Sequence, residues 1–195
     1  KKLLAGESVS INGFEARLPY ASARDIPILI AATGPKTIEL AGEVADGVLL
    51  LVGIHPNMID TARRWFYAGA KKSVRDPNSL DMMVSARVRI EKDLKTSIDY
   101  ARPICAQWVV EPFHAQWLRD AGLDIPDVQL SPELAALYPD IPHAEDWEAA
   151  KKATAFLTDE KVQEIGDSLG IFGTPERCVD KIRQLSTLGV DHWYA

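Results

Sequence analysis

The sequence is poor in cysteine and has no strongly basic stripe, and both absences exclude classes of protein. Its two cysteines, Cys105 and Cys178, stand far apart without a CxxC pattern. A disulfide framework and a structural zinc site are therefore not expected, and reduced thiols in a cytoplasm are the favoured interpretation. The formal net charge is -6, with acidic and basic residues mixed along the chain. Nucleic acid is not an expected partner, because such partners require a basic face.

Long hydrophobic runs and nucleotide-binding glycine motifs are also missing. The longest strongly apolar stretch, Gly47 to Ile54, is much shorter than the ~20 residues that span a bilayer. No signal peptide opens the chain, and neither a GxGxxG nor a P-loop pattern occurs. These absences disfavour a membrane protein, NAD in a Rossmann crevice and ATP. A cytoplasmic protein that acts on a small molecule is the expectation.

What the sequence does contain is an ordinary globular composition of 195 residues, 47% hydrophobic and 26% charged. This length is enough for a sizeable core in one domain. The chain begins with Lys1 instead of methionine, and it ends at Ala195 in a segment that resembles the middle of a strand. We therefore expect a fragment of a longer protein.

Apolar runs alternate with helical patterns along most of the chain. A small β-hairpin is expected over Gly6 to Leu18, with a primed turn at Asn12-Gly13. Four later strands are predicted over 28–32, 48–52, 83–91 and from 190, with helices over 35–44, 57–72 and from 174 to about 188. The segment from Arg75 to Asp81 is predicted to be a loop. Strands that alternate with helices predict an α/β fold with a parallel sheet.

The stretch from about Ser97 to Ile165 breaks this alternation, because its pattern is helical and interrupted by prolines. Four strand–helix units are half of a (β/α)8 barrel, which needs roughly 200 to 250 residues. The predicted fold is therefore a partial TIM barrel with a helical insertion, about 97–165, before the last βα unit. Loop-like composition and mixed charge favour an insertion that covers the barrel mouth.

A turn with the sequence "AATGPK", residues 31–36, joins a buried strand directly to a helix. Pro35 fits the first helical position, and Gly34 allows close approach to the backbone. Free N–H groups at the helix start favour an anion such as a phosphate. Thr33 can donate its hydroxyl or cap the helix, and Lys36 can add charge. The alternative is that Thr33-Gly34-Pro35 is only a helix cap.

Three stretches carry a resemblance to a known family: "IPILIAATGPKTIELAGEVADGVLL", "LTDEKVQEIGDSLGIFGTPERCVDKIRQL" and "LGVDHWYA". They resemble the bacterial-luciferase-like superfamily, and within it the reductases and dehydrogenases that use the deazaflavin coenzyme F420, such as methylenetetrahydromethanopterin reductase. The resemblance implies that 28–32, 48–52, 83–91 and the segment from His192 are barrel strands 5 to 8. Strands 1 to 4, with part of the cofactor pocket, would precede Lys1.

The resemblance implies an oxidoreductase that moves hydride between F420 and a small organic substrate. Ala32, Thr33, Gly34, Pro35 and Lys36 would bind the cofactor. Catalytic residues would lie in the absent N-terminal half, so this fragment alone is expected to be inactive, and the full-length protein to be a homo-oligomer. One alternative is an FMN-dependent monooxygenase of the same superfamily. The other is a non-catalytic flavin-binding or truncated barrel.

Residues that follow the predicted strands are candidates for the substrate mouth. Gly53 and His55 follow the second run, and Glu91 ends the third. F420-dependent glucose-6-phosphate dehydrogenases have a lysine in the loop at Gly53 to His55, and its absence here argues against a sugar phosphate. His55, which precedes Pro56, is more typical of a loop histidine than of a proton donor.

Several other polar and aromatic residues have structural interpretations. Asp46 is expected to be a turn residue, and Thr174 an N-cap. Arg87 and Arg89 alternate on a predicted strand and would share one face, where they need partners. Glu111 and His114 have the ExxH spacing of a di-iron helix, but no second ExxH accompanies them, so a metal site is not predicted. The aromatic side chains of the insertion, at Trp108, Phe113, Trp117 and Trp147, are expected to pack within it.

Overall fold

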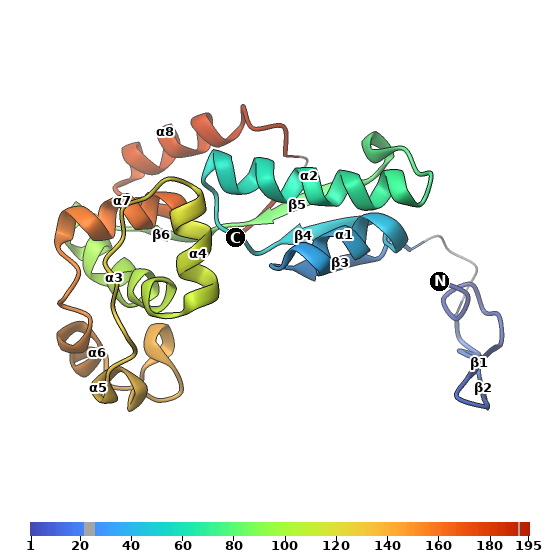
Figure 1. Cartoon of the computed structure of the whole chain (residues 1–195), viewed down its shortest axis with the longest axis horizontal. Coiled ribbons are helices and arrows are strands. Elements are labelled where there is room, and N and C mark those ends of the chain that lie inside the picture. The colour runs from blue at the N-terminus through green and yellow to red at the C-terminus, as the bar shows by residue number, and fades with distance from the viewer. Residues whose placement is uncertain (22–25, 191) are drawn as a thin grey trace.

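A computed structural model describes residues 1–21, 26–190 and 192–195 of the chain. In these ranges the backbone forms an arch, with a parallel sheet at its centre and a helical segment at one end (Figure 1). A two-stranded hairpin lies at the other end. Among the described residues no helix has the length and apolar character that a membrane span requires.

The hairpin near the N-terminus consists of β1 (Val9–Ile11) and β2 (Phe14–Ala16), which pair in antiparallel register. Asn12 and Gly13 between them have φ angles of 51° and 84°. Two consecutive positive φ values are the signature of a type I′ turn, for which Asn-Gly is the favoured pair. The predicted hairpin is confirmed.

The central sheet has four parallel strands in the order β3-β4-β5-β8. They are β3 (Leu29–Ala32), β4 (Gly47–Leu50), β5 (Asp81–Ser85) and β8 (His192–Tyr194). The prediction of an α/β fold with a parallel sheet is confirmed. Asp191, in the last predicted strand, lies outside the described residues, and the predicted loop before β5 contains a short 3-10 helix, Pro77–Ser79.

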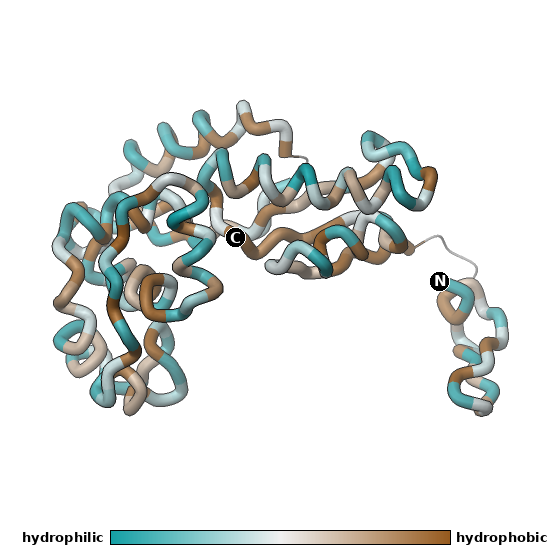
Figure 2. The backbone as a smooth tube through the Cα atoms, viewed as in Figure 1, coloured by the Kyte–Doolittle hydropathy of each residue, from teal (hydrophilic) through white to brown (hydrophobic). Residues whose placement is uncertain are grey.

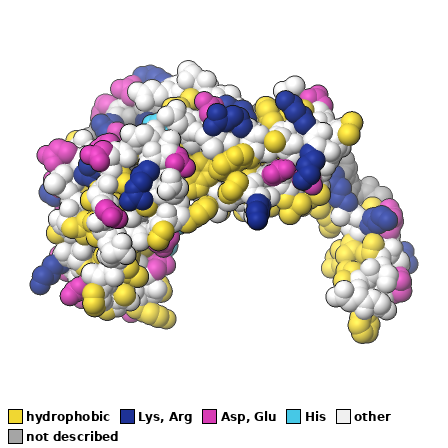
Figure 3. Space-filling model, in the orientation of Figure 1, with side chains coloured by type: hydrophobic (Ala, Val, Ile, Leu, Met, Phe, Trp, Pro, Cys, Tyr) yellow, Lys and Arg dark blue, Asp and Glu magenta, His cyan; other side chains and the backbone are white. Residues whose placement is uncertain are grey.

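One face of this sheet is covered by α1 (Pro35–Val44) and α2 (Pro56–Lys72). Val48, Leu50 and Val84 are completely buried and belong to one hydrophobic cluster with residues of these helices. The strands are predominantly hydrophobic in Figure 2. The opposite face is more open, since Leu51 is 39% exposed, and hydrophobic side chains gather along the concave side of the arch (Figure 3).

Glycines bring α1 and α2 into close contact. A Cβ atom at Gly42 would overlap the Phe66 carbonyl oxygen, and one at Gly69 would overlap the Glu39 carbonyl oxygen. The backbones therefore touch at this crossing, which any side chain beyond hydrogen would prevent.

The predicted strand from Met83 to Glu91 is wrong as a single element. It divides at Ala86, whose amide donates to the Tyr194 carbonyl at 2.8 Å. Beyond that point β6 (Arg87–Ile90) leaves the sheet and pairs in parallel with β7 (Gly170–Gly173). β7 was not predicted, and the arginines of β6 do not lie on the central sheet.

The segment between β6 and β8 is mainly helical and begins three residues earlier than predicted, at Leu94. Its helices are α3 (Leu94–Val110), α4 (Pro112–Asp120), α5 (Pro132–Ala135), the 3-10 turn Ile141–His143, α6 (Trp147–Ala153) and α7 (Asp159–Leu169). The last helix, α8 (Pro175–Leu185), follows β7 and ends before the predicted Leu188.

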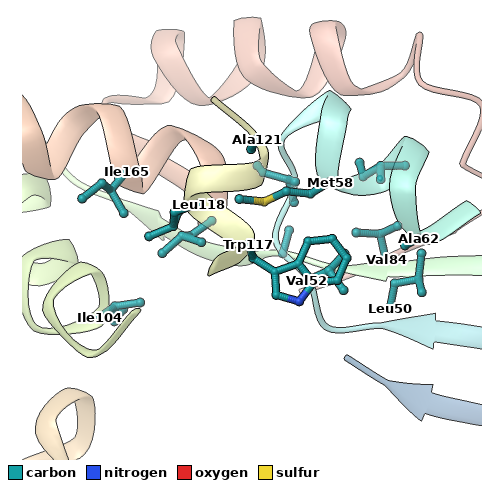
Figure 4. Close-up of a cluster of buried hydrophobic side chains, with 14 of the residues drawn as sticks. Leu50, Val52, Met58, Ala62, Val84, Ile104, Trp117, Leu118, Ala121 and Ile165 are labelled. Carbon is teal, nitrogen blue, oxygen red and sulfur yellow. The ribbon is translucent and has the colours of Figure 1, made fainter. Parts of the chain in front are cut away.

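Trp117 of α4 anchors this helical segment to the sheet. It is 6% exposed, and its ring meets that of Trp65 edge-on, with centroids 5.4 Å apart. Figure 4 shows it beside Val52, within a continuous cluster of buried side chains that extends to Ile104 and Ile165. The helices and the sheet thus share one hydrophobic core.

A buried arginine fastens α7 to α3. The Arg102 side chain is 9% exposed and donates to the Leu157 carbonyl and the Asp159 carboxylate. Burial by itself would raise the pKa of Asp159, but the hydrogen bond from Arg102 and the charge of Lys95 hold that pKa below its usual value.

Replacing Arg102 by methionine should lower the free energy of unfolding by about 1–2 kcal/mol, because two acceptors lose their donor. Arg119→Met is the matched control, since Arg119 only approaches Asp127 at 3.9 Å on the exposed surface. Urea denaturation followed by circular dichroism measures both changes. Equal stability of the two variants would contradict a structural role for Arg102.

Candidate functional site

A pocket of about 580 Å³ lies at the carboxyl ends of all four central strands. Thr33 follows β3, Gly53 follows β4, Ser85 ends β5 and Ala195 follows β8. Ligands bind at this edge in parallel α/β folds, because loops there vary while the strands hold them in place. The location makes this pocket the candidate functional site.

The opposite wall of the pocket comes from the helical segment and from β6. Its residues are Arg87, Val88, Tyr100, Gln107, Trp108, His114 and Leu169. The helices therefore lie over the carboxyl ends of the strands, the side on which the insertion was expected.

In the turn that follows β3, Thr33 does not cap the helix, and the other predicted cofactor residues, Ala32, Gly34, Pro35 and Lys36, are not among those that line the pocket. Gly34 is the N-cap of α1, with φ −97° and ψ 153°, and no side chain caps the helix there. Thr33 instead lines the pocket. The alternative in which Thr33 caps the helix is therefore wrong, because the chain stays extended one residue further than the Thr-Gly-Pro pattern indicates.

Without a side-chain cap, the first turn of α1 has free donors. Pro35 has no N–H, and the first intrahelical bond runs from Ile38 N to Gly34 O at 3.0 Å. Among the described residues, no side chain accepts from the amides of Lys36 and Thr37. These amides and the positive end of the helix form a place for an anion.

Open space accompanies these donors. A Cβ atom at Gly34 would have Phe113 Cζ as its nearest neighbour, at 3.9 Å. An exposed Lys36 side chain stands next to it, whereas Ala32 is buried and offers only its backbone, with its carbonyl accepting from Leu51 N at 3.0 Å. A ligand can therefore approach the backbone at Gly34 without steric obstruction.

The three predicted mouth residues have different places. Gly53 lines the pocket and requires glycine, since its φ is +85° and a Cβ would lie 2.6 Å from the Ser168 carbonyl oxygen. His55 caps α2, its Nδ1 accepting from Asn57 N at 3.2 Å, and does not line the pocket. Burial, and then the charge of Lys181, lower the pKa of His55 and favour its neutral form.

Glu91 lies after β6, outside the pocket lining. Its carboxylate accepts from Arg89 Nε at 2.5 Å, and its amide donates to the Gly173 carbonyl at 2.9 Å. The prediction that it belongs to the mouth assumed one continuous strand, which the break at Ala86 removes. Glu91 fixes Arg89 and the end of β6.

Glu111 and His114 are not an exposed helix pair. Glu111 separates α3 from α4, and its Oε2 lies 2.5 Å from His114 Nδ1. The His114 ring stacks on Trp108, with centroids 4.5 Å apart and an interplanar angle of 20°. The sequence predicted a solvated helix here, which is wrong for His114, because its ring and that of Trp108 form part of the pocket wall. Among the described residues no group of three metal-binding side chains occurs.

The structure confirms the structural roles predicted for two residues outside the pocket, Asp46 and Thr174. Asp46 is a turn residue whose Oδ2 accepts from Ile28 N at 2.8 Å, and Thr174 caps α8 by accepting from Arg177 N at 3.5 Å. Cys105 and Cys178 are free buried thiols, and burial raises both of their pKa values. Neither is suited to act as a nucleophile.

Comparison with known proteins identifies relatives along nearly the whole chain. The family model described as luciferase-like monooxygenase matches residues 1–192. A 5,10-methylenetetrahydromethanopterin reductase from Methanolobus tindarius is 34% identical over 192 residues, covering 96% of this chain and 54% of the relative. One from Archaeoglobus fulgidus is 31% identical over 185 residues, covering 95% and 51%.

A solved structure gives the same picture of the fold. The coenzyme F420 dependent tetrahydromethanopterin reductase from Methanopyrus kandleri aligns with a TM-score of 0.69 at 24% identity, covering 99% of this chain and 53% of that one. The chain thus spans about half the length of the curated relatives that it matches.

Proposed function

The chain belongs to the luciferase-like monooxygenase family, and from that premise we propose that it is part of an oxidoreductase dependent on coenzyme F420. The full-length protein would transfer hydride between the deazaflavin and a small organic substrate. The similarity to two methylenetetrahydromethanopterin reductases and the structural similarity to an F420 dependent reductase support this proposal.

We further propose that β3, β4, β5 and β8 are strands 5 to 8 of a (β/α)8 barrel. Their parallel order, their helices on one face and the more open opposite face support this placement. In a closed barrel the open face would become the interior. The helices from Leu94 to Leu169 would then be an insertion over the barrel mouth.

The single observation that carries the proposal is the uncapped start of α1 at the carboxyl end of β3. Lys36 and Thr37 present free amides beside the open space at Gly34, and Lys36 adds a positive charge. These groups fit a phosphate, which the deazaflavin coenzyme carries. When bound, the coenzyme would supply the hydride chemistry, and this chain would hold and orient it.

The other walls of the pocket would exclude water and position the substrate. Tyr100 and Trp108 supply flat apolar surface, and Gly53 keeps the rim free of a side chain. Exclusion of water strengthens electrostatic contacts and prevents side reactions. FMN also has a phosphate, so the turn accepts either cofactor, and the relatives are what favour F420.

Equilibrium dialysis of the full-length protein against F420 and against FMN tests the proposal. We expect F420 to bind at least about tenfold more tightly, a difference of 1.4 kcal/mol. Reduction of the bound deazaflavin, followed by its visible absorbance, should then accompany oxidation of an organic donor. Preferential retention of FMN with oxygen-dependent turnover would contradict the proposal and support the monooxygenase alternative.

A further inference from the structure

The pocket at the carboxyl ends of the strands has an unbalanced charge. Its described lining contains one arginine, Arg87, together with the imidazole of His114, and contains no aspartate or glutamate. The chain as a whole is acidic, at −6. A positive lining on an acidic protein attracts anionic ligands to this place in preference to the rest of the surface.

The Arg87 side chain has no hydrogen-bond or ion-pair partner among the described residues, in contrast to that of Arg89 two positions further along β6. Arg89 donates to Glu91 at 2.5 Å, and its guanidinium lies 4.6 Å from the centre of the Tyr100 ring. These contacts hold Arg89 to the protein. Arg87 keeps its five N–H donors available, in a geometry that suits a carboxylate or a phosphate.

A polar network holds His114 in the wall that comes from α3 and α4. Gln107 Nε2 donates to Glu111 Oε1 at 2.8 Å, and Glu111 Oε2 lies 2.5 Å from the buried His114 Nδ1. This contact lies outside hydrogen-bond geometry, so Nδ1 has no hydrogen-bond partner among the described residues. With Nδ1 against Glu111 and one ring face on Trp108, Nε2 is the nitrogen left for a ligand.

We propose that this pocket recognises an organic substrate through an oxyanion group, a carboxylate or a phosphate, which contacts Arg87, while His114 Nε2 provides a second hydrogen bond. The inference rests on the proposed function, because it assigns the substrate class of the same site. Arg87 and the α1 turn then have separate tasks, one toward the substrate and the other toward the coenzyme phosphate.

Calorimetric titration of the full-length protein, with and without F420, tests this assignment. The probes are benzoate, phenyl phosphate and the neutral benzamide. Arg87→Met should weaken binding of the tighter anionic probe about tenfold and leave benzamide unchanged, as expected for loss of a charged hydrogen bond. Arg89→Met is the matched control and should stay within about twofold of the parent, because Arg89 is already occupied.

Two further variants make the result specific. Arg87→Lys keeps the positive charge but loses the paired N–H donors of the planar guanidinium. Its affinity for the anionic probe should therefore lie between those of the parent and Arg87→Met. His114→Phe keeps the stack on Trp108 and should weaken the anionic probe about threefold, which is below the effect of Arg87→Met. Circular dichroism establishes that each variant is folded. Tighter binding of benzoate indicates a carboxylate substrate, and tighter binding of phenyl phosphate indicates a phosphate.

Three outcomes would overturn the inference. The first is that the parent binds neither anionic probe better than benzamide. The second is that Arg87→Met binds both anions as the parent does. The third is that Arg87→Met loses F420 affinity alone, which would place Arg87 at the coenzyme. Anion binding through Arg87 in a protein that does not bind F420 would instead refute the proposed function while preserving the anion site.

Discussion

Replacing Gly34 by valine is expected to weaken F420 binding to the full-length protein about a hundredfold and to leave the fold intact. The valine side chain would occupy the space through which the phosphate reaches the amides of Lys36 and Thr37. Loss of two hydrogen bonds to a charged group amounts to about 3 kcal/mol or more. The binding constant from fluorescence or dialysis measures the effect.

The structure indicates why the variant should fold. Gly34 has an extended backbone, with φ −97° and ψ 153°, that valine readily adopts. The nearest atom to its new Cβ is Phe113 Cζ at 3.9 Å, an ordinary contact distance. Valine is a poorer N-cap than glycine, so a loss of stability below about 1 kcal/mol is expected.

Thr174→Val is the matched control for this experiment. Thr174 begins α8 before Pro175, as Gly34 begins α1 before Pro35, but it follows β7, which is not a strand of the central sheet. Its substitution should cost about 0.5–2 kcal/mol of stability through loss of the cap and should leave coenzyme affinity unchanged. If Gly34→Val folds and binds F420 as the parent does, the turn has no role in cofactor binding.

The second large effect is expected on stability, from Gly69→Ala in the middle of α2. An alanine Cβ there would overlap the Glu39 carbonyl oxygen of α1, and Gly42 faces Phe66 in the same close crossing. Backbone atoms cannot rotate away, so the two helices must separate over the sheet. We expect a loss of about 3 kcal/mol, in spite of the higher helix propensity of alanine.

Gly166→Ala is the control, since Gly166 also lies within a helix, α7. Its added Cβ would meet Phe172 Cδ2 at 3.5 Å, which is ordinary contact. Alanine there should be neutral or stabilise the protein by up to about 1 kcal/mol. The urea midpoints of the two variants measure the contrast, and equal midpoints would refute the tight helix crossing.

Local signals predicted those parts of the fold that local chemistry determines. The Asn12-Gly13 pair fixes the hairpin, because both residues tolerate positive φ. Pro35 fixes the start of α1, and the apolar runs at β3 and β4 fix strands that a parallel sheet buries. These features depend on neighbours within a few residues.

The errors arise where distant segments decide the structure. β7 has four residues with glycine at both ends, and it becomes a strand because β6, about eighty residues earlier, pairs with it. The same pairing pulls Arg87 away from the central sheet and breaks the predicted strand at Ala86. No periodicity in either segment indicates this partnership.

Only part of the site was predicted, because distant segments of the chain form the rest of it. Thr33 and Gly53 follow strands directly, so their place at the pocket could be inferred from the order of elements. Trp108 and His114 reach the pocket only because α3 and α4 fold back over the sheet. The ExxH spacing of Glu111 and His114 was the available signal, but we interpreted it as part of a solvated helix, and so the place of His114 in the pocket wall was missed.

Hydrogen–deuterium exchange across the peptide 33–38 tests the central claim most directly. The full-length protein would be measured alone, with F420, and with the deazaflavin that ends at the ribityl group and lacks the phosphate. If the α1 turn holds the coenzyme phosphate, F420 should slow exchange of the Lys36 and Thr37 amides, and the phosphate-free deazaflavin should not. Equal protection by both ligands, or no protection by bound F420, would contradict the account.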